Sequence, residues 1–134
     1  TIAAGLYHCG ILDSSGNVWI FGIDKGEEFV QLIQGEYTTL TAAENISHMI
    51  DSKGDVWTIG TRYSVMMGIN KTLFRPLEPC RISSLHNIIE ISTSDTHTLA
   101  LEDDGTVWGC GDNSFGQLGC ESKPQISFIK IVGF

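Results

Sequence analysis

The stretch that decides the fold is GTVWGCGDNSFGQLG, residues 105–119, in which glycine recurs at positions 105, 109, 111, 116 and 119. A glycine-rich segment of this kind can be a phosphate-binding loop, which needs a strand before it and a helix after it. The glycine spacing does not match G-x-G-x-x-G, because the third glycine comes late, and no G-K-[ST] is present. Pro124 is followed by a short alternating apolar run, which predicts a strand instead of a helix. The glycines therefore fit the turns and strand ends of a β-fold better than a phosphate site.

The same tetrad occurs three times along the chain, and its copies hold all three tryptophans: Gly16-Asn-Val-Trp19, Gly54-Asp-Val-Trp57 and Gly105-Thr-Val-Trp108. Six residues after each leading glycine stands another glycine, at Gly22, Gly60 and Gly111. Three residues before each leading glycine stands an acidic residue, at Asp13, Asp51 and Glu102. His8 and His97 share one register, where the second repeat has Ile46. The period is about 40 to 50 residues, which is typical of propeller blades.

Each repeat has the pattern of a strand, a tight turn and a second strand. The turns are S-S-G, S-K-G and D-D-G, and their glycine supplies the positive φ that a short hairpin needs. The second strand begins with Val-Trp, two residues favoured on a pleated, half-buried surface. The later glycine closes that strand, where a side chain would collide with a neighbouring backbone. Helical periodicity is weak throughout, so the chain is predicted to be all-β.

These marks resemble the regulator-of-chromosome-condensation repeat family. The A-A-G-x-x-H start lies at Ala3–His8, and N-x-x-G-Q-L-G lies intact at Asn113–Gly119. The resemblance covers nearly the whole chain and is weakest in repeat two, where Met66-Met67-Gly68 replaces Q-L-G. It implies blades of four antiparallel strands in a propeller of about seven blades. The structural repeat marks are Gly16, Trp19, Gly22, Gly54, Trp57, Gly60, Gly105, Trp108, Gly111, Gly116 and Gly119.

We expect residues 1–134 to be a single β-propeller segment, with repeats at about 1–38, 39–89 and 90–134. Three repeats do not close a ring, since propellers use roughly four to eight blades. The propeller is therefore incomplete or completed by oligomerisation. The missing blades belong to a longer parent chain, which is the interpretation we favour, or copies associate head-to-tail and two chains form six blades.

Composition excludes several classes of partner. The chain has 16 acidic and 8 basic residues and a net charge of −8, which argues against nucleic acid or a membrane as the main partner. Four cysteines include no C-x-x-C pair, so reduced thiols, buried at Cys9 and Cys110, are expected instead of zinc. Reduced thiols favour an intracellular location, cytoplasmic or nuclear. No metal or cofactor is expected.

The resemblance implies a protein–protein interaction scaffold. Family members promote nucleotide exchange on small GTPases, dock other proteins, or accompany ubiquitin-ligase or kinase modules. The predicted contact is the insertion of repeat two, TRYSVMMGINKTLFRPLEPC, through Arg62, Tyr63, Lys71, Phe74 and Arg75. Arginine and tyrosine often anchor interfaces, and residues 61–81 hold four bases and only one acid. The alternative is that its apolar residues pack between blades and its bases are solvated.

Enzymatic chemistry is not expected in this chain, which is at most an exchange regulator of a GTPase. Asp103 and Asp104, with Asp95 and His97, resemble an acid–base or metal cluster only superficially. The two aspartates are the repeat's turn, and the same turns elsewhere hold no carboxylate. His97 is expected to be structural, as is His8. The alternative function is a purely structural blade segment of a larger protein or assembly, such as a ubiquitin-ligase-associated propeller.

Overall fold

The computed structural model describes residues 1–24, 27–60, 68 and 78–132, and these residues form strands, turns and loops without a helix. Blade 1 contains β1 (Ile2–Ala4), β2 (His8–Leu12), β3 (Val18–Asp24) and β4 (Glu27–Ile33). Blade 2 contains β5 (Tyr37–Ala43), β6 (Ile46–Asp51), β7 (Val56–Gly60) and β8 (Cys80–Arg81). Blade 3 contains β9 (Ile88–Thr93), β10 (His97–Glu102), β11 (Val107–Gly111) and β12 (Gln125–Ile131).

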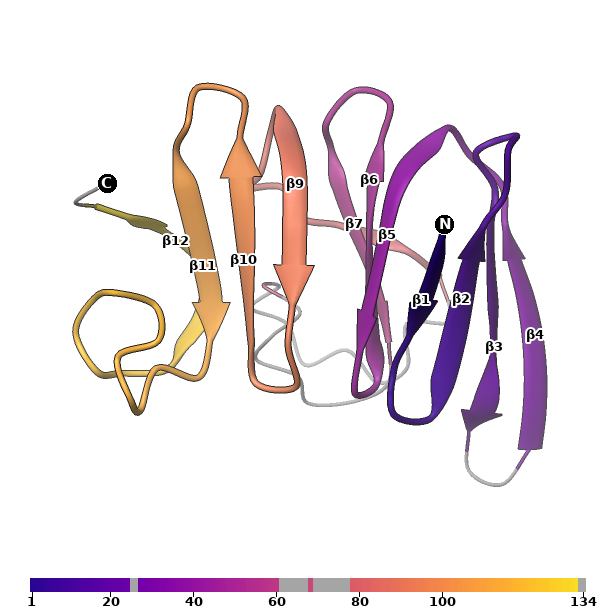
Figure 1. Ribbon diagram of the computed structural model, residues 1–134, viewed down its shortest axis with the longest axis horizontal. Helices are drawn as coiled ribbons and strands as arrows, with labels where there is room; N and C mark the ends of the chain where they lie inside the picture. The colour runs from indigo at the N-terminus through magenta and orange to yellow at the C-terminus, as the bar shows by residue number, and fades with distance from the viewer. Residues whose placement is uncertain (25–26, 61–67, 69–77, 133–134) are drawn as a thin grey trace.

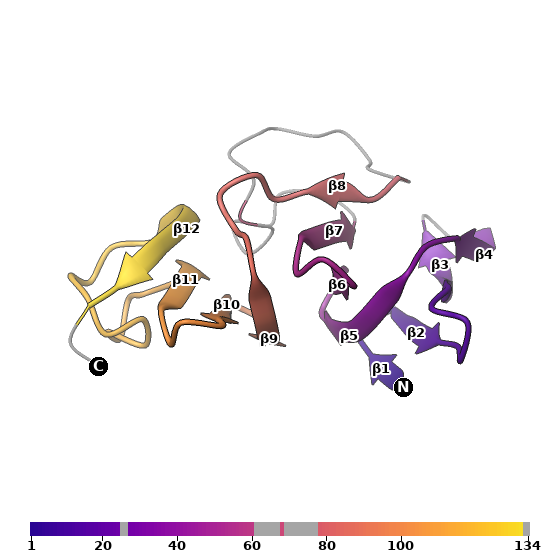
Figure 2. The same ribbon diagram turned by 90° about the horizontal axis from the view of Figure 1, so that it is seen from above.

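Each blade is a four-stranded sheet in which consecutive strands pair antiparallel. The three sheets stand side by side in chain order (Figure 1). Seen from above, they fan out, with β1, β5 and β9 on one side and β4, β8 and β12 on the other (Figure 2). The predicted all-β fold of four-stranded antiparallel propeller blades is confirmed.

The leading glycine of each tetrad occupies a hairpin turn with a positive φ. The angles are 83° at Gly16, 79° at Gly54 and 89° at Gly105, which confirms the predicted turn chemistry. The acidic residue before each turn has a role that sequence reasoning did not assign. One oxygen of Asp51 accepts the backbone N–H groups of Lys53 (2.9 Å) and Asp55 (3.0 Å), and the other accepts the indole N–H of Trp57 (2.9 Å).

The same indole bond recurs in the other two blades. Trp19 donates to Asp13 at 3.2 Å, and Trp108 donates to Glu102 at 2.9 Å. The repeated tryptophan and the repeated acid are therefore two halves of one contact across the turn. The bond satisfies the indole N–H while the ring packs in the sheet.

The glycines placed near the end of each second strand have no room for a side chain. A Cβ at Gly22 would lie 2.8 Å from the carbonyl oxygen of Tyr7, and at Gly60 and Gly111 it would collide with the corresponding carbonyls before β6 and β10. The predicted collision with neighbouring backbone is confirmed. Gly22 does not close its strand, however, because β3 continues to Asp24 as a hairpin with β4.

The hydrophobic cores lie between the blades. The first joins Leu12, Val18, Ile20 and Ile33 of blade 1 to Leu40, Met49 and Ile59 of blade 2. The second joins blades 2 and 3 through Ile50, Val56, Ile82, Leu85, Ile88, Ile91, Ala100, Cys110 and Phe128. Each sheet thus packs against its neighbours, and blade 2 is covered on both faces.

Backbone hydrogen bonds join each hairpin turn to the segment that leads into the next blade. The carbonyl of Gly16 accepts the N–H of Tyr37 at 3.0 Å, and the carbonyl of Gly54 accepts the N–H of Ile88 at 2.9 Å. Within blade 3, Asp103 donates its N–H to the carbonyl of Asn87 at 3.0 Å, where β9 begins and β10 ends. Side chains add to these contacts between blades.

Two histidines bond from one blade to the next. His8 Nε2 lies 2.8 Å from Ser47 Oγ, and His48 Nδ1 lies 3.1 Å from Thr93 Oγ1. His97 instead bonds Ser94 in the loop before its own strand, at 2.9 Å. The structural role expected for His8 and His97 is supported by these hydrogen bonds.

The cysteines only partly match expectation. All four are free thiols, and Cys110 is buried as predicted. The prediction that Cys9 is buried is wrong, because Cys9 is exposed. Its neighbours His8 and Gly10 point toward blade 2, so alternation along β2 turns Cys9 to the opposite face of blade 1.

Candidate protein-interaction surface

The predicted contact residues lie outside the described part of the chain. These residues are Arg62, Tyr63, Lys71, Phe74 and Arg75, and their proposed role stays a prediction. Within that insertion the structure describes Gly68, which is buried with a φ of 63°. A side chain there would collide with the ring of Phe128 in β12, so this point of the insertion packs against blade 3.

The turns and loops of the blades gather at two opposite ends. The hairpin turns β2–β3, β6–β7 and β10–β11 lie at one end, here called the turn end (Figure 1). The loops β1–β2, β5–β6, β9–β10 and β11–β12 lie at the other, here called the loop end (Figure 1). The longest fully described loop is β11–β12, residues 112–124, and it contains the N-x-x-G-Q-L-G motif.

Asn113 closes the β11–β12 loop from inside. Its side chain is fully buried, and its Oδ1 accepts the N–H of Leu118 at 2.8 Å. Its Nδ2 donates to the carbonyls of Glu121 at 2.6 Å and Cys120 at 3.3 Å. Leu118 itself is buried. The motif's asparagine and leucine therefore hold the two arms of the loop together, as a packed and hydrogen-bonded unit.

Gln117 fixes the tip of the same loop. Its Oε1 accepts the N–H of Phe115 at 3.0 Å, and its Nε2 donates to Asp112 at 3.0 Å. Gly116 takes a φ of 76°, which permits the sharp bend at the tip. The glutamine and glycine of the motif therefore set the backbone on which Phe115 stands.

Phe115 is 93% exposed at this tip. Sequence reasoning did not select it as a contact residue, although the signal was present: an aromatic side chain at a position that the repeat does not require. A phenyl ring on a fixed backbone suits an interface anchor, because little conformational freedom is lost when a partner covers it.

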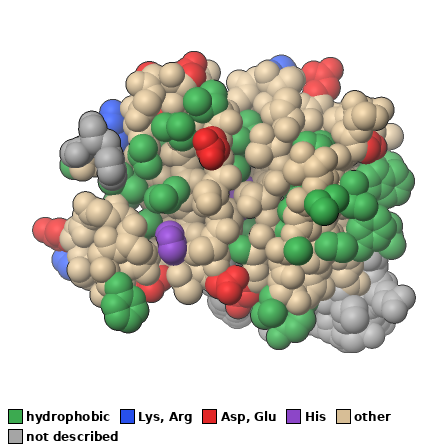
Figure 3. All heavy atoms as spheres, in the orientation of Figure 1, with side chains coloured by type: hydrophobic (Ala, Val, Ile, Leu, Met, Phe, Trp, Pro, Cys, Tyr) green, Lys and Arg blue, Asp and Glu red, His purple; other side chains and the backbone are tan. Residues whose placement is uncertain are grey.

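The surroundings of Phe115 are acidic. The hydroxyl and backbone N–H of Ser114 bond Asp112 and lower the pKa of that carboxyl, so Asp112 is ionised at neutral pH. Glu121 is exposed and lies 3.8 Å from Lys123, an ion pair in full contact with solvent. Acidic side chains are spread over several elements of the face seen in Figure 3. A partner that covers this loop is favoured if its own rim is basic.

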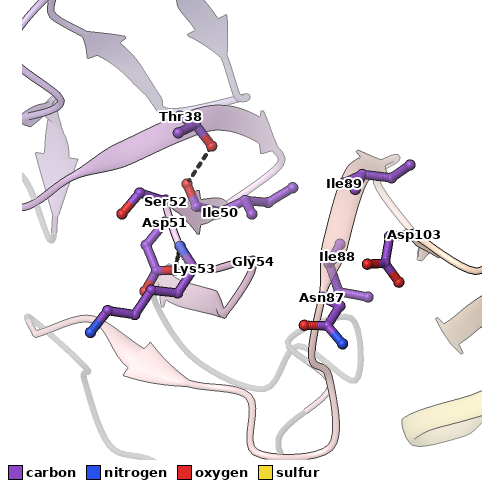
Figure 4. Close-up of a pocket in the computed structure, with 10 residues that line it drawn as sticks. All are labelled: Thr38, Ile50, Asp51, Ser52, Lys53, Gly54, Asn87, Ile88, Ile89 and Asp103. Atoms are coloured by element: carbon purple, nitrogen blue, oxygen red, sulfur yellow. Dashed lines mark hydrogen bonds between the residues drawn. The ribbon is translucent and has the colours of Figure 1, made fainter.

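The turn end carries a pocket of about 370 Å³ between blades 2 and 3 (Figure 4). The turn residues Ser52, Lys53 and Gly54 line one side, and Asn87 and Ile88 line the other. In the described parts of the chain, no three side chains of the metal-binding types come together. The lining also includes Asp51 and Asp103, so the pocket offers both polar and apolar contacts.

Asp103 and Asp104 of the third repeat lie in its hairpin turn. Gly105 donates its N–H to the carbonyl of Glu102 at 3.0 Å, and Asp104 accepts the N–H of Thr106 at 2.8 Å. The latter bond is the main cause of a lowered pKa at Asp104. An ionised carboxylate bonded to its own backbone stabilises the hairpin and does not suit a general acid.

Comparison with known proteins agrees with this architecture. A family model described as a regulator of chromosome condensation (RCC1) repeat matches residues 88–117, from β9 into the β11–β12 loop. The X-linked retinitis pigmentosa GTPase regulator homolog of Caenorhabditis elegans is 27% identical over 90% of this chain and 10% of its own. The E3 ubiquitin-protein ligase HERC2 of Mus musculus is 28% identical over 88% of this chain and 3% of its own.

Two solved structures share the fold. Prp20p from Saccharomyces cerevisiae superposes with a TM-score of 0.81 at 15% identity, over 99% of this chain and 38% of Prp20p. Human WBSCR16 superposes with a TM-score of 0.82 at 18% identity, over 99% of this chain and 39% of its own. The chain thus spans a tenth or less of the two sequence relatives and about two fifths of these structures.

The three sheets are consecutive blades of a β-propeller. The repeat of blade 3 matches the regulator-of-chromosome-condensation repeat model, and the sequence relatives extend the similarity over most of the chain. The described residues include no helix long and apolar enough to cross a membrane.

Proposed function

We propose that the chain is a protein–protein interaction scaffold that binds its partner at the loop end, with Phe115 as an anchor. The observation that carries the proposal is a phenyl ring, 93% exposed, on a loop closed by the buried side chain of Asn113. An aromatic ring on a backbone that is already ordered loses little conformational freedom when a partner covers it, which favours binding at this loop.

The partner that we propose is a small GTPase, and the activity is regulation of its nucleotide exchange. Support comes from the relatives: Prp20p is described with binding properties to Gsp1p and histones, and the nematode relative is called a GTPase regulator homolog. The net charge of −8 disfavours nucleic acid and anionic membranes as partners. Four free thiols support a cytoplasmic or nuclear location.

The test is a titration of purified, GDP-loaded Gsp1p into the chain, with binding measured by isothermal titration calorimetry. Phe115→Ala is expected to raise the Kd at least tenfold, because removal of an anchor aromatic costs about 2 kcal/mol or more. Ile89→Ala is the matched control, since Ile89 is also exposed (59%) but lines the pocket at the turn end. Equal weakening by both changes, or no change by either, contradicts the loop-end site.

The release of a fluorescent GDP analogue from Gsp1p then tests exchange regulation. Faster release with the chain than with Phe115→Ala supports that activity. The alternative is a set of structural blades within a larger protein. This alternative is supported by the similarity to a ubiquitin-protein ligase of which the chain covers only 3%. Absence of any binding to the GTPase supports this alternative.

A further inference from the structure

Two neighbouring apolar side chains stand exposed at the loop end of blade 1. Leu6 and Tyr7, in the β1–β2 loop, are 64% and 62% exposed. With the three tetrads aligned on their leading glycines, the same two positions hold Glu44 and Asn45 in blade 2 and Asp95 and Thr96 in blade 3. The other two repeats therefore place polar residues here, and the apolar pair is a departure of blade 1.

The exposure of this position does not depend on the blade that precedes it. Asp95 and Thr96 are exposed although blade 2 packs against blade 3, and Glu44 is half-buried although blade 1 packs against blade 2. A blade in front of blade 1 would therefore leave Leu6 and Tyr7 at least partly open to solvent.

The backbone that carries Leu6 and Tyr7 is held on both sides. Leu6 donates its N–H to the carbonyl of Glu44 at 2.9 Å. The carbonyl oxygen of Tyr7 lies against Gly22, where an added Cβ would approach it to 2.8 Å. The two side chains thus stand on an ordered loop, as Phe115 does, and little backbone freedom is lost when a partner covers them.

Acidic residues lie between this pair and Phe115 along the loop end. The β1–β2, β5–β6, β9–β10 and β11–β12 loops share this end (Figure 1), and they hold, in chain order, Leu6, Glu44, Asp95 and Phe115. Hydrophobic side chains show at two separated places along the bottom of the molecule, with acidic side chains between them (Figure 3). A partner that covers this end is favoured if it has basic side chains between two apolar contacts.

One interface of ordinary size reaches both ends of this row. Packed sheets lie about 10 Å apart, so two junctions separate blade 1 from blade 3 by about 20 Å. A standard protein–protein interface buries about 800 Å² on each partner, which corresponds to a patch about 30 Å across. A single folded partner therefore covers the loops of all three blades, whereas a short peptide bound at one loop does not.

We infer that Leu6 and Tyr7 form a second anchor for the partner that Phe115 contacts, and that Glu44 and Asp95 select a basic surface on it. This inference rests on the proposed interaction at the loop end. The partner is a folded protein that presents two apolar contacts on either side of a basic centre. It binds as one molecule per chain, because both anchors belong to one interface.

Calorimetric titration with GDP-loaded Gsp1p tests the second anchor. Tyr7→Ala is expected to raise the Kd about tenfold, with one GTPase bound per chain. Val30→Ala is the matched control, because Val30 is 65% exposed in the same blade but lies in the middle of β4. Equal weakening by both changes overturns the second anchor, as does the binding of two GTPases per chain.

The same titrations separate this inference from the proposed function. If Phe115→Ala weakens binding and Tyr7→Ala leaves it unchanged, the second anchor is wrong and the loop-end site stands. If the wild-type chain does not bind Gsp1p, both are overturned.

Salt dependence tests the acidic centre. Glu44→Gln combined with Asp95→Asn removes two negative charges at nearly constant side-chain shape. The variant is expected to bind more weakly than wild type at low salt and to lose most of the salt dependence of the Kd. Glu90→Gln combined with Asp103→Asn is the matched control, since it removes the same charge from exposed residues outside the loops of this end. The same salt dependence in the two double variants overturns the acidic centre.

Discussion

Alanine at Gly54 and at Gly105 separates backbone strain from lack of space. The two glycines occupy the same turn position with nearly the same φ, 79° and 89°. A Cβ at Gly54 would lie 2.9 Å from the Cα of Asn87 and 3.1 Å from the N of Ile88. A Cβ at Gly105 would meet nothing within 4 Å. The two glycines therefore have nearly the same backbone conformation, but only Gly54 lies against a neighbouring backbone segment.

The expected losses of unfolding free energy follow from this geometry. A left-handed backbone conformation destabilises an L-residue with a side chain by about 1–2 kcal/mol. Both alanine substitutions are therefore expected to lower the unfolding free energy by this amount. At Gly54 the segment leading into blade 3 must also shift, and overpacking of this kind costs about 1–3 kcal/mol. We therefore expect a loss of about 1–2 kcal/mol for Gly105→Ala and about 2–5 kcal/mol for Gly54→Ala.

Urea unfolding followed by tryptophan fluorescence measures both losses. Performing it at low chain concentration limits any contribution from association between copies. Equal losses at the two sites would refute the argument, because the contact with Asn87 would then have no energetic weight. A larger loss at Gly105 than at Gly54 would refute it as well.

Three further predictions rest on single side chains. Burial lowers the pKa of His8 below its ordinary 6.5, so as the pH drops the unfolded chain binds a proton before the folded chain does. The unfolding free energy should therefore fall as the pH drops through about 6.5. His8→Asn is expected to reduce this fall, measured by urea titrations between about pH 7.5 and 5.5. Asp51→Ala loses the bonds to Trp57 and the turn and is expected to cost about 2–3 kcal/mol in urea, whereas Asp51→Asn costs less because an acceptor remains. Cys9 is expected to react with Ellman's reagent in the folded chain, but Cys110, whose pKa burial raises to about 12, only in denaturant, and rapid reaction of both would contradict the packing of β11.

The turns and crowded strand ends could be predicted because their requirements are local. A positive φ at Gly16 or a collision at Gly60 follows from a few consecutive residues. The bond from Trp57 to Asp51 was missed although both residues were recognised as repeat marks. Their pairing depends on hairpin register, which brings residues six apart in sequence to one side of the turn.

Exposure was harder to predict because it depends on neighbouring blades. The run around Cys9 has the alternation of a half-buried strand, and the sequence alone does not tell which face is covered. Phe115 was missed for a related reason: the motif accounts for its neighbours, and only the position of the loop tip shows that the ring faces solvent. The predicted contacts from Arg62 to Arg75 lie outside the described residues, so they remain a prediction.

Placing each core between two sheets has a consequence for cooperativity. An open row of sheets has one core fewer than it has sheets, whereas a ring has as many cores as sheets. Closing a ring therefore adds a core without lengthening the chain, as in a linear array whose two ends are joined. Before closure, amide hydrogens of β6, where residues 46–50 are all buried, should exchange last. Those of β1 and β12 should exchange first, and ring closure should bring all three blades to a common, slower rate.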